Sequence, residues 1–377
     1  MYIYKHQDWP EFKWDTDKIL ALLTDVRNLQ GRVVGRMGTL GFELRDQANL
    51  AILTQDVLRS SEIEGELLNP EQVRSSIIRQ LGLDISTGIV PSERNVDGVV
   101  EMMIDATANF NKPLTRQRLF GWHNALFPAG YSGAQRILAG KWRDDSRGPM
   151  QVVSGPIGRE KVHYQAPPSS CLGKEMKKFL EWFNNDQELD LVIKAALTHL
   201  WFVTVHPFED GNGRIARALT DMILARSDGQ SYRFYSMSAQ IRNERKQYYD
   251  ILEQTQKGDL DITKWLEWFL CCLRNALKSS NIILEKVLLK HEFWNINSLR
   301  IENERQRKIL NRLLDGFEGK LTTSKWAKIT KCSPDTALRD IKDLIDKKIL
   351  YKLPEGGRST GYALVQKYKP GFKGQEK

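Results

Sequence analysis

The sequence predicts a mainly α-helical protein with one β-hairpin in its central region and a small mixed module at its C-terminal end. Three observations lead to this fold class. Apolar residues recur at spacings of three and four over most of the chain, which is the period of an amphipathic helix. One clear strand–turn–strand pattern interrupts the central helices, around 150–164. The segment 303–365 shows three helices followed by two strands, which is the order of a winged helix-turn-helix.

The N-terminal region is predicted to be entirely helical. Helices are expected over 15–34, 40–59 and 70–81. Pro70 supports the start of the third helix, because proline is favoured at the first helical position. The next segment, 81–93, contains Gly82, Gly88 and Pro91 and is predicted to be a connection. A helical N-terminal domain is therefore expected over 1–94.

The central region is predicted to be an α-fold with a hairpin inserted. Its helices are expected over 95–110, 115–126, 171–184, 189–205, 214–226, 243–256 and from 263 onward. The hairpin consists of strands at 150–153 and 161–164, joined by a turn at 154–158. We expect a central domain over 95–275 and a helical connector over 276–300.

The C-terminal segment 301–377 is predicted to be a winged-helix domain. Its helices are expected over 303–314, 323–329 and 333–347, and its strands over 349–353 and 361–365, with a turn at 354–357. From Arg300 to Lys377 there are 19 lysines and arginines against 10 acids, so this module carries the whole net charge of +9. Such a module can meet nucleic acid or an acidic partner.

The helix over 333–347 is the candidate groove reader of this module. Its exposed side is predicted to carry Thr336, Arg339, Asp340 and Asp343. Two acids on that side are unfavourable for contact with phosphates. DNA binding and protein docking therefore both stay open for the C-terminal domain.

Composition excludes several classes of protein. No run of about 18 apolar residues occurs, which excludes a transmembrane helix. The first ten residues lack the charged and then apolar order of a signal peptide, so a cytoplasmic location is expected. The four cysteines show no CxxC spacing, which argues against a zinc finger and a disulfide scaffold.

The segment 206–217, with sequence HPFEDGNGRIAR, carries the clearest chemical signal. Pro207 biases His206 out of the preceding helix, so the imidazole is expected at a helix end beside a loop. A new helix begins after Gly213, and its positive N-terminus points at that loop. Arg214 and Arg217 lie three residues apart on this helix, so both can reach one anion. The segment therefore predicts an anion cradle that also contains a carboxylate and a titratable imidazole.

Two other phosphate-binding motifs do not fit this segment. A P-loop needs a lysine after its glycines, and none follows here. The spacing of Gly211, Gly213 and Ala216 matches a dinucleotide fingerprint, but that fingerprint requires a preceding strand. The preceding segment is predicted to be a helix that ends before a proline.

The segment 206–217 resembles the signature of Fic-domain proteins, HxFx[DE]GNGRxxR, and matches it at every fixed position. The resemblance covers about 95–273 and implies a Fic-type helical core. The region before it, with Trp9-Pro10 and 60–65, resembles the helical domain often found before a Fic core. The C-terminal region resembles the winged helix that some members carry.

This resemblance implies a protein adenylyltransferase, which moves AMP from ATP to a serine, threonine or tyrosine hydroxyl of a protein. His206 would be the catalytic base, and Asp210 would hold Mg²⁺ through the ATP phosphates. Asn212, Gly213 and Arg214 would cradle the α- and β-phosphates, and Arg217 would bind the γ-phosphate. The implied nucleotide-binding residues are Glu64, Phe208, Asp210, Gly211, Asn212, Gly213, Arg214, Arg217, Tyr248 and Tyr249.

A second segment bears on regulation. The residues 60–65, SSEIEG, resemble the inhibitory motif [ST]xxxE[GN] of the same family, in which the glutamate pairs with the second arginine of the signature. The resemblance implies that Ser60, Glu64 and Gly65 form this motif and that Glu64 inhibits transfer. A purely structural alternative exists, because Ser61 and Glu64 also have the spacing of a capping box at a helix N-terminus.

Other family features follow from the resemblance. The hairpin around 155–158 would be the flap that registers the target by strand pairing, and Tyr248 and Tyr249 would line the adenine pocket. The expected partners are a protein target, a second copy in a homodimer, the chain itself through self-modification, and DNA through the basic domain. Two alternative functions stay open, a hydrolase that removes AMP from proteins and a nucleotide-sensing DNA-binding regulator.

Overall fold

The computed structural model describes residues 1–83, 89–156, 159–185, 189–301, 303–317, 319–354 and 360–365. The chain forms two compact units, which we call unit 1 (Met1–Ser280) and unit 2 (Asn281–Lys377). Helices dominate the described residues, and the strands occur in small antiparallel pairs, which confirms the predicted fold class. The predicted turn residues at 88, 157–158 and 355–357 lie outside the described residues.

Unit 1 begins with a short 3₁₀ turn, Ile3–Lys5, and then three helices, α1 (Thr16–Gly38), α2 (Phe42–Ile63) and α3 (Pro70–Leu81). Asp15 caps α1 by accepting hydrogen bonds from the backbone N–H groups of Asp17 and Lys18. Asn69 caps α3 in the same way, and Gly82 ends that helix in the left-handed conformation.

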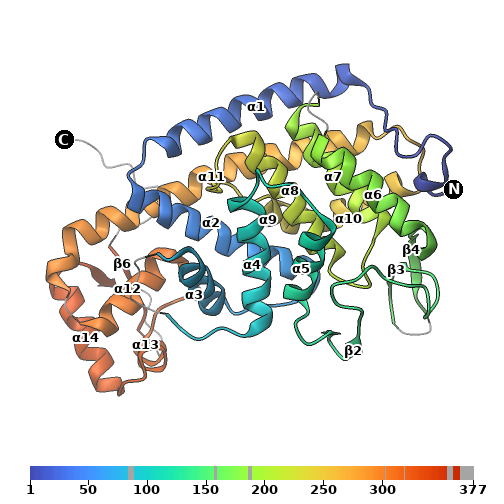
Figure 1. Cartoon of the computed structure of the whole chain (residues 1–377). Helices are drawn as coiled ribbons and strands as arrows, with labels where there is room; N and C mark the ends of the chain where they lie inside the picture. Colours follow the sequence, from blue (N-terminus) through green and yellow to red (C-terminus); the bar gives the residue numbers. More distant parts are fainter. Residues whose placement is uncertain are drawn as a thin grey trace. The chain divides into compact units, whose positions relative to one another are not determined.

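The interior of unit 1 is built around two consecutive helices, α7 (Leu191–Val205) and α8 (Asn212–Asp228), which pack against each other (Figure 1). Nearly every residue of α7 is buried, which explains why its sequence is apolar on all sides. Helices α2 and α4 (Arg94–Ala108) contact α8, and α5 (Arg116–Leu126) and α6 (Ser169–Asn185) pack on α4 and α7 respectively. These contacts hold in place the two helices on either side of the α7–α8 loop.

Two hairpins occur in unit 1. The predicted one is present as β3 (Gln151–Ser154) and β4 (Lys161–Gln165), paired antiparallel. A second ribbon, β1 (Tyr131–Ser132) with β2 (Gln135–Arg136), was not expected from the sequence. Strands of two residues are too short to produce an alternating pattern, so the local sequence cannot reveal them.

The last helices of unit 1 are α9 (Met237–Asn243), α10 (Arg245–Gln256) and the first part of α11 (Thr263–Asn297). The sequence predicted α10 but missed α9, whose seven residues span less than two full turns of amphipathic pattern. Helix α11 continues past Ser280 into unit 2.

Unit 2 contains a 3₁₀ turn, Ser298–Arg300, and then α12 (Glu304–Gly316), α13 (Thr323–Thr330), α14 (Pro334–Asp346), β5 (Leu350–Lys352) and β6 (Tyr362–Leu364). Its core packs around the fully buried Trp326 together with Ile341 and Leu344 of α14. Leu321 forms an isolated antiparallel bridge with Tyr362, which ties the segment before α13 to the ribbon.

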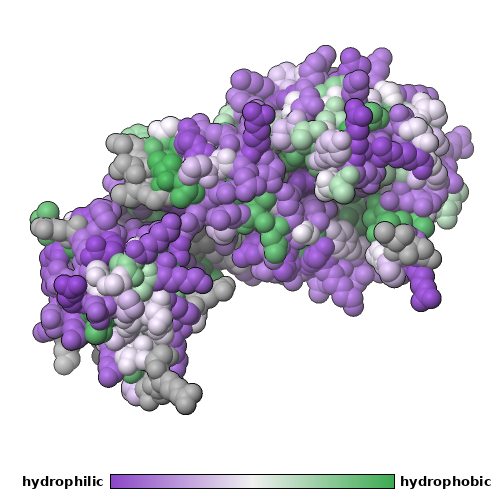
Figure 2. All heavy atoms as spheres, turned by 90° about the horizontal axis from the view of Figure 1, so that it is seen from below, coloured by the Kyte–Doolittle hydropathy of each residue, from purple (hydrophilic) through white to green (hydrophobic). Residues whose placement is uncertain are grey.

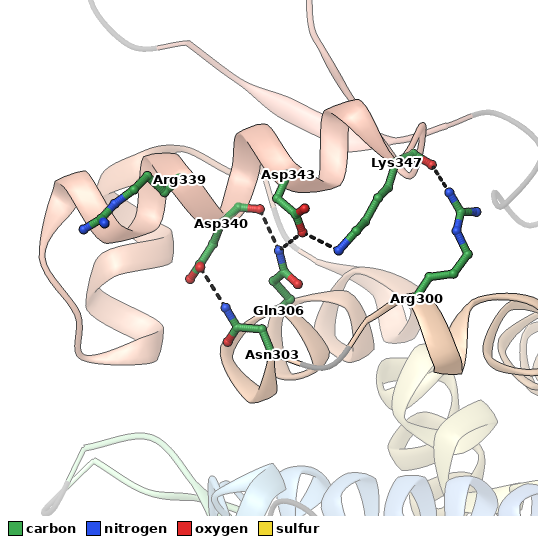
Figure 3. A pocket seen from close by; sticks show the side chains of 7 residues that line it. All are labelled: Arg300, Asn303, Gln306, Arg339, Asp340, Asp343 and Lys347. Atoms are coloured by element: carbon green, nitrogen blue, oxygen red, sulfur yellow. Dashed lines mark hydrogen bonds and ion pairs between the residues drawn. The ribbon is translucent and has the colours of Figure 1, made fainter.

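The predicted exposed side of α14 needs a correction. Asp340 is buried, 7% exposed, and its carboxylate accepts hydrogen bonds from Asn303, just before α12, and from Arg305 in α12. Asp343 accepts from Gln306 and Lys347. Figure 3 shows both acids turned toward α12, around a polar cavity of about 550 Å³, while Arg339 points away from them. The prediction was wrong for Asp340, because helical period alone cannot show that α12 covers that side, whereas the Asp343 side chain is 45% exposed.

The face of the molecule drawn in Figure 2 is mostly hydrophilic, with scattered apolar residues. Within the described ranges, no helix combines the length and the apolar composition needed to cross a membrane.

The contact between α4 and α5 yields a test of the fold. A Cβ atom on Gly98 would lie 1.7 Å from the backbone oxygen of Ala125, so any larger residue must push the two helices apart. We expect Gly98→Ala to lower the free energy of unfolding by about 2–4 kcal/mol, measured by chemical denaturation. Gly121→Ala in α5 is the matched control, because no atom lies within 4 Å of its added carbon, and it should raise stability by about 0.5–1 kcal/mol. Equal effects of the two changes would contradict this packing.

Candidate active site

The loop between α7 and α8 reverses the chain within a few residues. His206 ends α7 in the left-handed conformation, φ 50°, and its N–H donates to the carbonyl oxygen of Phe202 at 3.0 Å. Gly211 is also left-handed, φ 78°, and α8 begins at the next residue. A side chain on Gly211 would come within 2.9 Å of the Phe127 ring, so glycine is required there for both reasons.

The side chain of Asn212 holds the loop closed. Its Oδ1 accepts from the N–H of Phe208 at 3.0 Å, and its Nδ2 donates to the carbonyl oxygen of Phe208 at 2.8 Å. Asn212 is buried, so these two bonds occupy the amide. Any anion at this loop therefore meets the backbone N–H of Asn212 and not its side chain.

Arg143 holds the backbone around His206 in place. Its Nε donates to the carbonyl oxygen of His206 at 2.8 Å, its backbone N–H donates to that of Pro207 at 2.9 Å, and its Nη2 donates to that of Pro167 at 2.6 Å. The guanidinium is buried and also pairs with Asp145 at 2.7 Å. Arg143 thus joins the loop after β4 to the loop after α7.

His123 supports the other end of the loop. Its Nδ1 accepts from the N–H of Gly140 at 2.9 Å, so its Nε2 carries the hydrogen and donates to the carbonyl oxygen of Asp210 at 3.2 Å. The ring stacks on Phe208, with ring centroids 4.2 Å apart. Burial lowers the pKa of His123 to about 4, which keeps it neutral and able to hold both bonds.

His206 is presented as a neutral base. Its Nδ1 lies 3.1 Å from the carbonyl oxygen of Val203, so Nδ1 is the donor and Nε2 keeps its lone pair. Burial lowers the pKa of His206, and the charge of Arg143 acts in the same direction. An imidazole in this state can accept a proton at Nε2 at neutral pH.

The two acids of the loop have different surroundings. Asp210 accepts from the N–H of Gly211 at 2.5 Å and from the hydroxyl of Ser132 in β1. Glu209 accepts from the backbone N–H of Leu138 at 2.8 Å, which fixes it against the segment after β2. Among the described residues, no group of three or more His, Cys, Asp or Glu could hold a metal ion. A cation at Asp210 would thus need further oxygen ligands from a bound molecule, which suits Mg²⁺ carried by phosphates.

Arg217 is buried and paired with α2. Its Nε donates to the hydroxyl of Ser60 at 2.9 Å, and its Nη2 donates to the carbonyl oxygen of Ser60 at 2.8 Å and to Oε1 of Glu64 at 2.7 Å. Burial acts to lower the pKa of Arg217, but the charge of Glu64 and the two nearby tyrosines raise it overall. A Cβ atom on Gly213 would lie 2.1 Å from Oε1 of Glu64, so only glycine leaves space for this carboxylate.

The end of α2 excludes the capping-box alternative. Ser61 and Glu64 lie at the C-terminal end of the helix, whereas a capping box stabilises a helix N-terminus. The N–H of Gly65 donates to Glu62 O and that of Glu66 donates to Ser61 O, both at 3.0 Å, which is the Schellman arrangement. Gly65 takes the left-handed conformation that this arrangement needs, φ 88°.

Arg214 has a carboxylate partner that the sequence did not predict. Its Nη1 donates to Oε2 of Glu66 at 2.7 Å, and its guanidinium lies 5.0 Å from the centre of the Phe127 ring. Glu66 follows Gly65 directly, so the presence of a second acid two residues after Glu64 was the sequence feature that could have indicated this pair. The sequence also missed Arg143, His123 and Ser132, which long-range packing brings to the loop and which no local motif marks.

The two predicted adenine-pocket tyrosines differ. Tyr249 is 39% exposed, and its hydroxyl lies 3.3 Å from the carbonyl oxygen of Ile63, next to Glu64. Tyr248 is only 2% exposed, and its hydroxyl donates to Nε2 of His199 at 2.8 Å. Both tyrosines influence the pKa of Arg217, so both lie around its guanidinium. Only Tyr249 presents substantial surface to a ligand.

The β3–β4 hairpin is anchored close to the motif. The hydroxyl of Tyr164 in β4 donates to the carbonyl oxygen of Thr204 at 2.7 Å, two residues before His206. The pairing register shifts between Val152 and Val153, and the displaced His163 bonds to Glu253 of α10 at 2.6 Å. The hairpin is therefore held both at α7 and at α10.

Comparison with known proteins finds a family match over the part of the chain that contains this loop. A model described as "Fic/DOC family" matches residues 113–224, which include the whole segment 206–217. The chain contains a Fic/DOC domain. A second model, "Domain of unknown function (DUF4172)", matches residues 2–83, and this match includes Glu64.

Curated relatives of this Fic/DOC domain are named protein adenylyltransferases. "Protein adenylyltransferase Fic" of Drosophila grimshawi is 37% identical over 114 residues, which cover 29% of this chain and 22% of the relative. The protein of the same name from Culex quinquefasciatus is 26% identical over 212 residues, 55% of this chain and 37% of the relative. The chain thus matches less than half of the length of each.

A solved structure shares the fold over nearly the full length. A Fic family protein from Desulfovibrio desulfuricans is 20% identical, with 96% of this chain and 98% of that chain covered and a TM-score of 0.51.

The hydrogen bonds of His199 predict a pH dependence of stability. Thr220 donates to the carbonyl oxygen of Ala216, so its hydroxyl oxygen accepts from Nδ1 of His199. Burial lowers the pKa of His199 to about 3. Because the folded pKa lies below the unfolded value of about 6.5, the neutral ring stabilises the fold at pH 7, and this contribution falls as the pH drops toward 3.

We expect the stability difference between the unaltered chain and His199→Gln to shrink by about 2 kcal/mol between pH 7 and pH 5. Denaturant titrations of both proteins at the two pH values measure it. A difference that does not change with pH would show that His199 is not buried in its neutral form.

Proposed function

We propose that the chain is a protein adenylyltransferase that transfers AMP from ATP to a hydroxyl side chain of a protein. One observation carries this proposal: a neutral imidazole, that of His206, lies at the same loop as the N-terminus of α8 with its two buried arginines. A base beside a site for several phosphate groups is what the transfer of a nucleotidyl group to a hydroxyl needs. The names of the relatives support the same reaction.

In this mechanism each group at the loop has one task. Nε2 of His206 takes the proton of the target hydroxyl, whose oxygen bonds to the α-phosphorus while the bond to the β-phosphate oxygen breaks and pyrophosphate leaves. The first N–H groups of α8, at Asn212, Gly213 and Arg214, have no partner within the helix and point at the phosphates. Arg217 binds the γ-phosphate once it is released from Glu64.

Asp210 is the residue that would hold Mg²⁺. Its carboxylate has hydrogen-bond donors at Gly211 and Ser132 that orient it. When bound, Mg²⁺ neutralises charge on the phosphates and on the leaving pyrophosphate. Phe208 acts indirectly, since it is fully buried and positions the loop through Asn212 and His123.

Glu64 inhibits this reaction in our proposal. Its carboxylate forms an ion pair with the guanidinium of Arg217 at 2.7 Å. The carboxylate also lies over Gly213, where the phosphates would approach α8. Ser60 holds the same arginine through its hydroxyl and carbonyl oxygens. An ATP molecule that cannot bind Arg217 lacks the contact that sets its γ-phosphate, so its α-phosphate is not aligned with the target hydroxyl.

The test is Glu64→Gly with labelled ATP and Mg²⁺. We expect transfer to protein, self-modification included, to rise at least tenfold, because Arg217 becomes available to the γ-phosphate. Adding His206→Ala to this variant should abolish transfer and leave ATP affinity within about twofold, since the imidazole acts on the hydroxyl and does not hold phosphates. Unchanged transfer in Glu64→Gly would exclude the inhibitory role. If the unaltered chain released AMP from a modified protein and the Glu64 variant did not, removal of AMP would be its activity.

Unit 2 has a second candidate function, the binding of duplex DNA by a winged helix. The observation that favours it is that α12 buries Asp340, while the partly exposed Asp343 is paired with Gln306 and Lys347. The exposed charged residues of α14 and of the segment from 328 to the start of α14 are Lys328, Lys331, Asp335, Arg339, Lys342 and Asp346. Cations outnumber acids on this surface, which suits contact with phosphates.

The DNA proposal is tested with Lys328→Glu/Lys342→Glu. We expect the unaltered chain to bind a mixed-sequence duplex in fluorescence anisotropy with an affinity that falls as salt rises. The double variant should bind more weakly and show a salt slope smaller by about 2, one for each lost phosphate contact. Lys174→Glu on the exposed surface of α6 is the control and should leave unit 2 binding unchanged. Equal effects of the control and the double variant would argue for nonspecific attraction only.

A further inference from the structure

Both arginines of the segment 206–217 are neutralised by one short turn. Glu64 pairs with Arg217 and Glu66 pairs with Arg214, and both ion pairs have N–O distances of 2.7 Å. The guanidinium side chains are almost fully buried, 6% exposed for Arg214 and 2% for Arg217, whereas the two carboxylates are about one-third exposed. The two carboxylates therefore lie nearer to the protein surface than the guanidinium groups with which they pair.

The backbone turn is what places two acids on one side. Glu64 is the C-cap residue of α2. Glu66 lies two positions later, after Gly65, which is in the left-handed conformation. The N–H of Glu66 donates to Ser61 O, which folds the chain back toward α2. Two carboxylates separated by one glycine thus meet the N-terminus of α8, where an anion is stabilised by the helix dipole and by both arginines.

We propose that Glu66 is a second determinant of nucleotide affinity, which occupies Arg214 in the way that Glu64 occupies Arg217. The turn 64–66 acts as a mimic of two phosphate groups, and a nucleotide must displace both carboxylates to reach the N-terminus of α8. This inference rests on the proposed function, since it concerns the same phosphate site.

The surroundings of Arg214 explain why the pair matters. Its guanidinium lies against Phe127 and its Nε has no hydrogen-bond partner among the described residues. A buried guanidinium without its carboxylate is unfavourable, so removing Glu66 leaves a cation that needs another anion. A role in which Glu66 instead holds Arg214 in the position that phosphate requires predicts the opposite change in nucleotide affinity.

The experiment measures ATP·Mg²⁺ binding by isothermal titration calorimetry, with pyrophosphate as a second probe. We expect Glu66→Gln to tighten binding of both by about tenfold, which corresponds to an Arg214–Glu66 pair that is closed in about 90% of molecules. The Glu64→Gly/Glu66→Gln double variant should bind more tightly than Glu64→Gly alone, because Arg214 stays occupied when only Glu64 is removed.

Glu62→Gln is the matched control. Glu62 lies on the same segment and loses the same charge, but it pairs with Arg59 and Arg242 and not with the motif arginines. The affinity of Glu62→Gln for ATP·Mg²⁺ and for pyrophosphate should stay within twofold of that of the unaltered chain. Glu66→Asp keeps the charge and shortens the side chain by one methylene, so it should give an intermediate affinity with the backbone turn intact. Thermal unfolding of each variant verifies that the fold is retained.

Two outcomes would overturn the inference. Equal nucleotide affinity of Glu66→Gln and Glu62→Gln, in both backgrounds, would show that the Arg214–Glu66 pair does not compete with nucleotide. Weaker binding in Glu66→Gln would show that Glu66 positions Arg214 for the phosphate. Because affinity is measured without transfer, a chain that binds nucleotide but transfers no AMP would contradict the proposed function and leave this inference standing.

Discussion

The positive N-terminus of α8 and the two guanidinium groups beside it are buried together, and this concentration of positive charge must be compensated. Because a buried ion pair that loses one partner costs about 3–5 kcal/mol, an anion beside each guanidinium stabilises the site. In this structure the anions are the carboxylates of Glu64 and Glu66, brought by the turn after α2. The same need makes the site attractive to phosphates. In the function that we propose, regulation and ligand binding are thus two consequences of one electrostatic constraint.

The conformation of the loop that carries His206 depends on three polar side chains around it, one charged and two neutral. Arg143 stays charged and donates to the backbone carbonyl oxygens of His206 and of Pro167, which lies in the loop after β4. His123 stays neutral, because burial lowers its pKa, and it can both accept and donate a hydrogen bond. Asn212 closes the loop from inside. None of these side chains has to touch a substrate, but together they set the position of Nε2 of His206.

Much of the fold could be predicted from local sequence, and the exceptions have clear causes. The amphipathic period predicted the long helices, and the alternation around 150–164 predicted the β3–β4 hairpin. The β1–β2 ribbon and α9 are too short to produce a period. The prediction that Asp340 is exposed was wrong because a neighbouring element can cover an acid on a helix surface. Only the contact with Arg305 and Asn303 shows this.

For the site, the sequence by itself determined the groups that are contiguous in the chain. Pro207 ends α7, Gly211 starts the turn into α8, and the spacing of Arg214 and Arg217 puts them on one helical face. The tertiary structure decided which carboxylates neutralise these arginines and how His206 is supported. Arg143, His123, Ser132 and Glu66 come from segments far apart in the sequence, and no local pattern records a contact made across such separations. Asn212 illustrates the difference, since the resemblance implies only that it cradles phosphates, and packing directs its side-chain amide to the backbone of Phe208. Local periodicity reflects the backbone geometry of one element, whereas ion pairing between elements depends on how they pack.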